Sequence, residues 1–238
     1  MPAEAYNKQK GGPTVEFEEE WLSKLNHCLT EYYDPETAIQ LMEGQDPENG
    51  SKQVIDWTRT LVEKIEEKDV DTAKNIFTCM ACQYPKSNLA EISKVYRETG
   101  DFAKAHSMLQ TYFIETIREY LGLSEEEISK VEEWGWGVAG RREGNRIIST
   151  KMPFDWAGYW AEEDPEIKRF HFCHCPRVRD VLKNQLDPIY ETYWLCGGGF
   201  YKSIWEHILD KQVSVEVLQT VMHSDPVCQF AIHLPEGV

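Results

Sequence analysis

Apolar side chains recur at intervals of three and four residues along the chain up to residue 133. This spacing predicts amphipathic helices, because positions three and four apart share one face of a helix. Caps and breakers separate the segments, and Ser124 with Glu127 forms a capping box at the start of the last one. We therefore expect a helical domain at residues 15–133, preceded by a disordered polar tail at residues 1–14.

From residue 134 onward the pattern changes to short segments in which apolar and polar side chains alternate. Alternation is typical of strands, whose side chains point to the two faces of a sheet in turn. Turn residues at 142–145 predict a hairpin that continues into an extended segment at 146–151. Further strands are expected at 168–175, 213–220 and 227–234, and helices at 177–186 and 200–209. The predicted fold is α+β, with the helical bundle packed on an antiparallel sheet domain with helices at residues 134–238.

The chain has 238 residues, of which 41% are hydrophobic, enough for a substantial core. Its formal net charge is −16, from 41 acidic and 25 basic side chains. This excess of negative charge argues against nucleic acid and membrane surfaces as partners, because binding there requires positive side chains that neutralise phosphate. No apolar run is long enough to span a bilayer, and the first residues lack the pattern of a signal peptide. We expect a cytoplasmic protein, in which thiols are reduced.

Four of the seven cysteines lie between residues 173 and 228, and this region holds most of the candidate chemistry. On the predicted strand 168–175, Cys173 and Cys175 share a face, so their sulfur atoms would lie near a common centre. Thiolates bind zinc tightly, which makes the two residues candidate metal ligands. The alternative is that both are small buried residues of the strand, since free cysteine is often buried.

Cys196 precedes three glycines, Gly197–Gly199, and the predicted helix at 200–209. A cysteine at the start of a helix favours its thiolate form, because N–H groups are exposed there. Cys196 is therefore a candidate nucleophile, and His174 or Glu191 a candidate proton carrier for it. The alternative is an ordinary turn into a helix, for which glycine is suited, with an incidental cysteine.

Two further groups are candidates for binding a substrate. Cys79 and Cys82 have the C-x-x-C spacing of redox and zinc sites, and we interpret them as facing the same cavity as the C-terminal cysteines. Aromatic side chains can line an apolar pocket for a small molecule. The aromatic candidates are Trp134, Trp136, Trp156 and Tyr159. The alternatives are that these aromatic residues form core and that a lone C-x-x-C has no function.

The C-terminal part of the chain also carries several short motifs in a fixed order. They are Cys-Pro at 175–176, Cys-Gly-Gly-Gly-Phe at 196–200, Val-Ser-Val-Glu-Val at 213–217 and Ser-Asp-Pro-Val-Cys-Gln-Phe at 224–230. In this order they resemble the 4-vinyl-reductase-type domain, a small-molecule-binding α+β module whose fold is shared with ligand-binding domains of nitric-oxide signalling and Golgi transport proteins. They also resemble the L-2-amino-thiazoline-4-carboxylic acid hydrolase-like family. The resemblance covers the chain from the Gly- and Trp-rich segment at residue 134 onward.

The resemblance to the 4-vinyl-reductase-type domain implies a zinc site. The positions that match its zinc ligands are Cys175, Cys196 and Cys228. A further cysteine that is usual in that domain is Thr220 here, which leaves the fourth ligand position to another residue or to water. The candidates for this position are Cys173, His174 and His223. An open position would suit catalytic zinc, because water bound there becomes a nucleophile near neutral pH.

The resemblance to the hydrolase-like family implies an enzyme that cleaves a C–N or C–S bond in a small, cyclic-amidine-like substrate. A cysteine-bound zinc ion or an activated cysteine would perform the reaction. The alternative is a non-catalytic, zinc-stabilised protein that binds a small molecule as a sensor or carrier, although no output module is recognisable. A reductase is disfavoured, because Gly197–Gly199 lacks the glycine spacing of a dinucleotide-binding motif. The expected partner is a small molecule, and a homodimer is left open.

Overall fold

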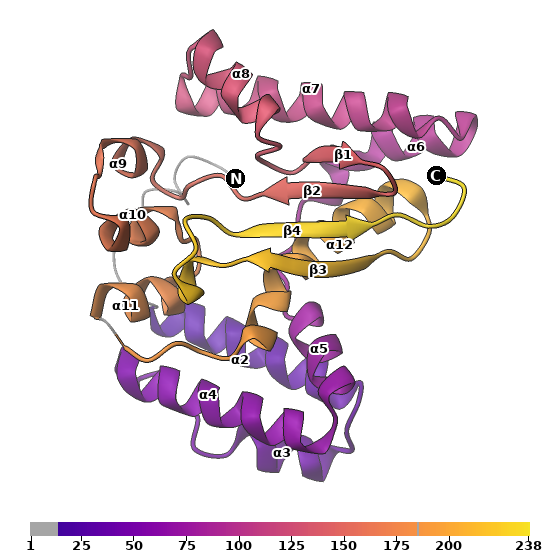
Figure 1. Ribbon diagram of the computed structural model, residues 1–238. Helices are drawn as coiled ribbons and strands as arrows, with labels where there is room; N and C mark the ends of the chain where they lie inside the picture. Colours follow the sequence, from indigo (N-terminus) through magenta and orange to yellow (C-terminus); the bar gives the residue numbers. More distant parts are fainter. Residues whose placement is uncertain (1–13, 185) are drawn as a thin grey trace. The chain divides into compact units, whose positions relative to one another are not determined.

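The computed structural model describes residues 14–184 and 186–238, apart from the side chain of Ser51. All but the last residue of the predicted tail at 1–14 lies outside the described residues. The described part contains eleven α-helices and one four-stranded antiparallel sheet (Figure 1), so the fold is α+β, as the sequence predicts.

The regular elements follow one another in an order that changes from helices to a mixture of helices and strands. The first half contains α2 (Val15–Thr30), α3 (Pro35–Met42), α4 (Ser51–Lys68), α5 (Val70–Cys79), the 3-10 helix η1 (Lys86–Leu89), α6 (Ala90–Thr99), α7 (Phe102–Leu121) and α8 (Glu125–Glu133). The second half contains β1 (Arg141–Glu143), β2 (Arg146–Thr150), α9 (Trp156–Ala161), α10 (Pro165–Phe172), α11 (Pro176–Asn184), η2 (Glu191–Trp194), α12 (Leu195–Leu209), β3 (Ser214–Gln219), η3 (Val221–His223) and β4 (Gln229–His233). The helical pattern predicted up to residue 133 is confirmed.

The contacts between residues divide the chain into two compact units. The helical unit consists of the described residues up to Ala81 together with Pro153–Cys196 and Val221–Pro226. The sheet unit consists of Cys82–Met152, Gly197–Thr220 and Val227–Val238. This division differs from the predicted boundary after residue 133, because α6, α7 and α8 precede that residue and belong to the sheet unit.

The helical unit is built from capped amphipathic helices. Asp34 caps α3 by accepting a hydrogen bond from the N–H of Thr37 at 3.0 Å, and Pro35 begins the helix with the φ angle that a first turn requires. Helices α2, α4 and α5 lie side by side (Figure 1). Their apolar faces form the core of this unit. Its most buried side chains, at most 1% exposed, include Leu25, Leu29, Leu61, Val62, Ile65, Ile76 and Phe77.

The strand predicted at 168–175 is wrong, because Pro165–Phe172 forms the helix α10. Asp164 accepts hydrogen bonds from the N–H groups of Glu166 and Ile167, and Pro165 occupies the first turn. This N-cap and proline start a helix, and the alternation of aromatic and polar residues after them does not override it. Cys173 and Cys175 therefore do not share a strand face. The residues predicted as a helix from 177 onward do form one, α11.

The sheet unit contains the strand order β1-β2-β4-β3, in which every neighbouring pair is antiparallel. The predicted hairpin is confirmed as β1 and β2, and the strands predicted at 213–220 and 227–234 as β3 and β4. In the central strand β4, Ile232 lies opposite Ile147 of β2 and Val215 of β3. Helix α12 lies against this sheet, and α7 packs on α12 through stacked rings of Phe102 and Trp205 at 5.4 Å.

The glycines Gly197–Gly199 lie inside α12, which begins at Leu195, so the predicted turn before a helix at residue 200 is wrong. A Cβ atom on Gly197 would lie 2.5 Å from the ring of Phe230, and one on Gly198 would lie 3.0 Å from Val215. Glycine is therefore used here for close approach of the helix to β3 and β4, and not for a turn.

None of the helices in residues 14–184 and 186–238 combines the length and the apolar character that a membrane span requires.

Candidate functional site

A buried phenol lies at the centre of the candidate site in the helical unit. Tyr193, in η2, is 1% exposed, and its hydroxyl oxygen lies 3.6 Å from the sulfur of Cys175. The ring of Tyr193 stacks on Trp21 of α2 at 6.3 Å and packs against Phe77 of α5 at 5.9 Å. Two helices from the start of the chain therefore hold the phenol that contacts this thiol.

A buried ion pair lies beside the phenol. The guanidinium of Arg177 donates to the carboxylate of Glu18 with N···O distances of 2.8, 3.1 and 2.7 Å, and to the hydroxyl of Thr58 at 2.9 Å. The Cζ atom of this guanidinium lies 3.5 Å from the ring centre of Trp21. Arg177 is 1% exposed and Glu18 is 2% exposed, so the charges are removed from water and neutralise each other.

Electrostatic coupling connects the ion pair to the thiol. Burial alone would lower the pKa of Arg177, but the hydrogen bond that it donates to Glu18 and its electrostatic interactions with Tyr193, Glu18 and Cys175 raise it. The guanidinium therefore stays charged within electrostatic range of the Cys175 sulfur. We call Cys175, Tyr193, Cys196, Arg177 and Glu18 the thiol–phenol cluster.

Burial raises the pKa of Tyr193 well above its ordinary value, and the charges of Cys175 and Cys196 raise it further, while Arg177 opposes them. The phenol therefore keeps its proton at neutral pH. In the contact between Tyr193 and Cys175, the hydroxyl is then the donor whenever the sulfur is ionised, since a thiolate can only accept. The phenol thus stabilises negative charge on the sulfur.

Cys175 also lies at the start of a helix. Its carbonyl oxygen accepts a hydrogen bond from the N–H of Arg179 at 2.9 Å, the first bond of α11, so Cys175 is the N-cap residue and Pro176 begins the helix. The N-terminus of a helix favours a thiolate through its unpaired N–H groups and dipole. The N-terminus of α11, the guanidinium of Arg177 and the phenol of Tyr193 therefore all favour the thiolate form of Cys175, whose side chain is half-buried.

The predicted nucleophile and the predicted proton carriers lie at three separate positions of the helical unit. Cys196 is the second residue of α12, half-buried, and close enough to Tyr193 to affect the pKa of the phenol. Glu191 begins η2 and is exposed. His174 is half-buried, with its ring edge-on to Phe154 at 5.6 Å. Among the residues predicted for chemistry, Cys175 thus contacts the phenol of Tyr193, and Cys196 affects the pKa of this phenol.

The predicted zinc site remains a prediction. Cys173 is buried and its sulfur lies 3.9 Å from the carbonyl oxygen of Cys175. Cys228 belongs to the sheet unit, where its carbonyl oxygen accepts from the N–H of Lys151 at 3.0 Å. Within the described part of the chain, no three His, Cys, Asp or Glu side chains form a group that could hold a metal ion.

The predicted aromatic pocket draws on residues from both units. Trp156 and Tyr159, on α9 in the helical unit, are 9% and 5% exposed. Trp134 and Trp136, in the sheet unit, pack on each other at 5.6 Å between ring centres. Trp136, Trp156 and Tyr159 are buried, whereas Trp134 is 39% exposed, and the predicted pocket stays a prediction.

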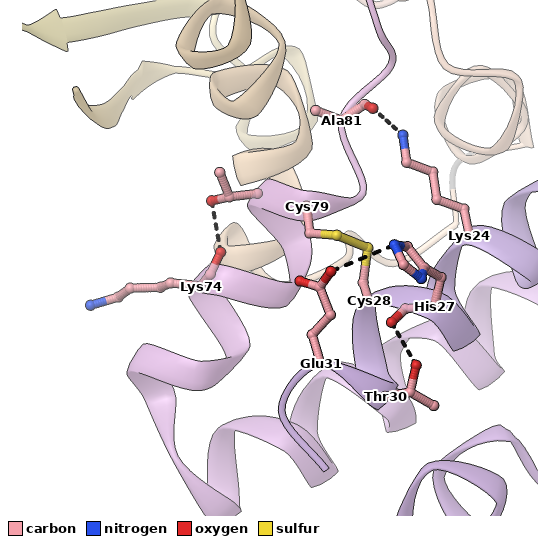
Figure 2. Close-up of a disulfide and its surroundings, with 9 residues drawn as sticks. Lys24, His27, Cys28, Thr30, Glu31, Lys74, Cys79 and Ala81 are labelled. Atoms are coloured by element: carbon pink, nitrogen blue, oxygen red, sulfur yellow. Dashed lines mark hydrogen bonds and ion pairs between the residues drawn. A yellow bond between two sulfur atoms is a disulfide. The ribbon is translucent and has the colours of Figure 1, made fainter. Parts of the chain in front are cut away.

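Cys79 does not belong to a pair of thiols with Cys82. It forms a disulfide with Cys28 that joins α5 to α2 (Figure 2), while Cys82 is an exposed free thiol. The expectation that all thiols are reduced is therefore wrong for Cys28 and Cys79. The two cysteines are 51 residues apart in the sequence, and only the tertiary packing of their helices brings them together.

Sequence reasoning missed Tyr193, Arg177 and Glu18. One signal was available for Glu18, which stands four residues before Leu22 and seven before Leu25, on the apolar face of α2. An acid on a buried helical face requires a partner, because an unpaired buried charge is costly. The identity of that partner, 159 residues away, was not readable from the pattern.

The comparisons with known proteins leave the function open. Neither the curated proteins nor the solved structures gave a match to this chain. Residues 148–238, which include Cys175, Tyr193 and Cys196, are similar to a family described as "Family of unknown function (DUF6144)".

Proposed function

We propose that the protein is a thiol-dependent enzyme that cleaves a C–N bond in a small, amidine-like substrate, with Cys175 as the nucleophile. The observation that carries the proposal is the contact between the Cys175 sulfur and the buried Tyr193 hydroxyl at 3.6 Å. A charged Arg177 lies within electrostatic range of the same sulfur. The substrate class rests on the resemblance of the C-terminal motifs to the thiazoline-carboxylic acid hydrolase-like family.

The proposed reaction has two steps. The Cys175 thiolate adds to the electrophilic carbon of the substrate, and the C–N bond breaks as the nitrogen leaves with a proton. Water then attacks the resulting carbon–sulfur intermediate and releases Cys175. Tyr193 holds its proton and donates a hydrogen bond to the sulfur before attack, which stabilises the thiolate. His174 and Glu191 stay predictions as the groups that move the protons of the leaving nitrogen and the water.

The test is turnover of a panel of cyclic and open amidines by full-length protein. We expect Cys175→Ser to reduce kcat/KM by at least about a thousandfold, because the nucleophile is lost. Tyr193→Phe should reduce it by about ten- to a hundredfold, because the donor to the sulfur is lost. The matched control is Tyr201→Phe, since Tyr201 is an equally buried tyrosine in the sheet unit. Full turnover by Cys175→Ser would refute the proposal.

A zinc-stabilised binding protein is the second candidate. It is favoured by the position of Cys175 and Cys196, whose charges both act on the Tyr193 phenol. Two thiolates near one point are a partial zinc site. This candidate predicts one bound zinc per chain by elemental analysis, lost together with folding stability in both Cys175→Ser and Cys196→Ser. Zinc-free protein that turns over an amidine at full rate would exclude it.

The cytoplasm remains the proposed location. The exposed free thiol of Cys82 supports it, because thiols are kept reduced in that compartment. The Cys28–Cys79 disulfide weighs against it, because stable disulfides are rare in that compartment and those found there are mostly transient.

A further inference from the structure

We propose that Cys28, Cys79 and Cys82 form a thiol–disulfide exchange site, which accepts electrons from glutathione or a protein dithiol and thereby controls the reactivity of Cys175. The exchange itself is independent of the proposed function, whereas the control of Cys175 rests on it. A transient disulfide would also reconcile this bond with a cytoplasmic location.

Exposure decides which sulfur reacts. Cys28 is 0% exposed, whereas Cys79, at the last position of α5, is partly exposed. An incoming thiolate therefore reaches the sulfur of Cys79, and the buried sulfur of Cys28 is the leaving group. Cys82 follows Cys79 by three positions and is an exposed free thiol. Cys79 and Cys82 have the C-x-x-C spacing of dithiol redox motifs, whose two cysteines close a disulfide with each other.

The exchange can be written in balanced steps. A glutathione thiolate attacks the Cys79 sulfur, the Cys28–Cys79 bond breaks, and Cys28 leaves as a thiolate that takes up a proton. The Cys82 thiolate then attacks Cys79, forms the Cys79–Cys82 disulfide and releases glutathione. A second round at this exposed bond consumes two glutathione thiols, which are oxidised to glutathione disulfide, and leaves all three cysteines reduced.

Two basic side chains of α2 lie at this site (Figure 2). The ammonium of Lys24 donates to the carbonyl oxygen of Ala81, the group that directly precedes Cys82 in the chain. His27, which is adjacent to Cys28, pairs with Glu31 at 3.5 Å. The hydrogen bond from Lys24 joins the segment before Cys82 to α2, the helix that carries Cys28.

The disulfide connects the two helices that hold the phenol of the thiol–phenol cluster. On α2, Trp21 stacks on Tyr193 and lies seven residues before Cys28. On α5, Phe77 packs on Tyr193 and lies two residues before Cys79. Reduction removes the covalent connection between α2 and α5, so the packing around Tyr193 can loosen and its contact with Cys175 weakens.

The exchange is tested on full-length wild type, Cys82→Ser and Gln83→Ser, a matched control at the neighbouring exposed position. Each protein is incubated with reduced and oxidised glutathione, blocked with N-ethylmaleimide at intervals, and analysed by peptide mass spectrometry. We expect a Cys79–Cys82 species in wild type and Gln83→Ser. In Cys82→Ser the original disulfide should be lost about tenfold more slowly, with glutathione retained on Cys79. Equal rates in all three proteins, without a Cys79–Cys82 species, would overturn the exchange site.

The control of Cys175 has a separate readout. The rate at which iodoacetamide alkylates Cys175 is measured in oxidised and in fully reduced protein. We expect reduction to lower the rate by about threefold or more, because the phenol and cation are positioned less well. An unchanged rate would overturn the control but leave the exchange intact. Neither result depends on turnover, so a failure of the proposed function, seen as an active Cys175→Ser variant, is distinguishable from both.

Discussion

Glu18 is the residue on which the buried charge of Arg177 depends, since its carboxylate accepts three N–H···O contacts of 2.7–3.1 Å. Replacing Glu18 by glutamine keeps the shape but removes the counter-charge of a guanidinium that is 1% exposed. Breaking one partner of a buried ion pair typically costs about 3–5 kcal/mol. We expect Glu18→Gln to lower the free energy of unfolding in urea by about that amount.

The matched control is Glu19→Gln, because Glu19 is exposed on the same helix. It should change the free energy of unfolding by less than about 0.5 kcal/mol. A loss of similar size in both variants would mean that α2 as a whole is sensitive to charge and that the ion pair is not the cause.

Asp155 is a second residue whose charge affects the stability of the fold. It caps α9 by accepting from the N–H of Gly158 at 3.0 Å, and its other oxygen lies 2.9 Å from Nδ1 of His171. Burial alone would raise the pKa of Asp155, but the hydrogen bonds from Gly158 and His171 lower it below its usual value. A carboxyl whose folded-state pKa is depressed stabilises the fold above its unfolded pKa and loses this contribution as the pH falls through the folded value.

Asp155→Asn isolates this effect, because asparagine still caps a helix but carries no charge. The side chain of Asp155 is 43% exposed, so solvent screens the pair and the variant should lose no more than about 1 kcal/mol at pH 7. The difference from wild type should shrink toward zero as the pH falls below the depressed pKa of Asp155, where both proteins are uncharged at this position. A difference in urea unfolding that stays constant from neutral to acid pH would contradict the assignment.

The residues of the site also show how far sequence reasoning reached. Cys196 was recognised as a candidate nucleophile and Cys175 as a candidate zinc ligand, because short motifs and helix starts are local features of the sequence. The partners of these thiols were not recognised, because Arg177 and Tyr193 have no unusual local pattern. Their role comes from contacts with α2 and α5, which lie more than a hundred residues earlier in the chain.

At the scale of elements, most helices and strands were predictable because caps and periodicity agree. Two segments differ, each for a physical reason. Alternation suggested a strand around Phe170 and Phe172, but the Asp164-Pro165 start forms α10. The glycines at 197–199 suggested a turn, but they lie in α12, where a side chain on Gly197 would clash with Phe230 of β4 and one on Gly198 would crowd Val215 of β3.

Gly197→Ala tests this account of α12. In an isolated helix the change would stabilise by about 1 kcal/mol. Here a Cβ atom would lie 2.5 Å from the ring of Phe230, which is 1% exposed and cannot move without disturbing β4. We expect a net loss of about 1–3 kcal/mol in the free energy of unfolding. In the double variant with Phe230→Leu the loss should be smaller than the sum of the single changes by about 1 kcal/mol. Strict additivity would show that the two residues do not compete for space.

At the scale of the whole molecule, the chain enters each compact unit more than once. The helical unit combines the first 81 residues with Pro153–Cys196, and the sheet unit combines Cys82–Met152 with later segments. Local patterns cannot reveal this, because each segment has the same periodicity whichever partner it packs against. The resulting fold brings Glu18 to Arg177 and Phe102 to Trp205, each pair within its own unit.

The discontinuous units predict that the chain cannot be divided at the boundary suggested by its hydrophobic pattern. In a fragment 134–238, Arg177 would lack Glu18, and the carbonyl groups of Pro188 and Asp187 would lack the guanidinium of Arg59, which donates to them at 3.2 and 2.6 Å. The sheet would also lack α6 and α7, which belong to its unit.

We expect fragments 1–133 and 134–238, each alone, to show poorly dispersed amide NMR spectra and no cooperative unfolding, because neither contains a complete core. Mixing them should restore the spectrum of the intact chain. A fragment 134–238 with a dispersed spectrum and a cooperative transition of its own would show instead that the boundary after residue 133 separates two independent domains.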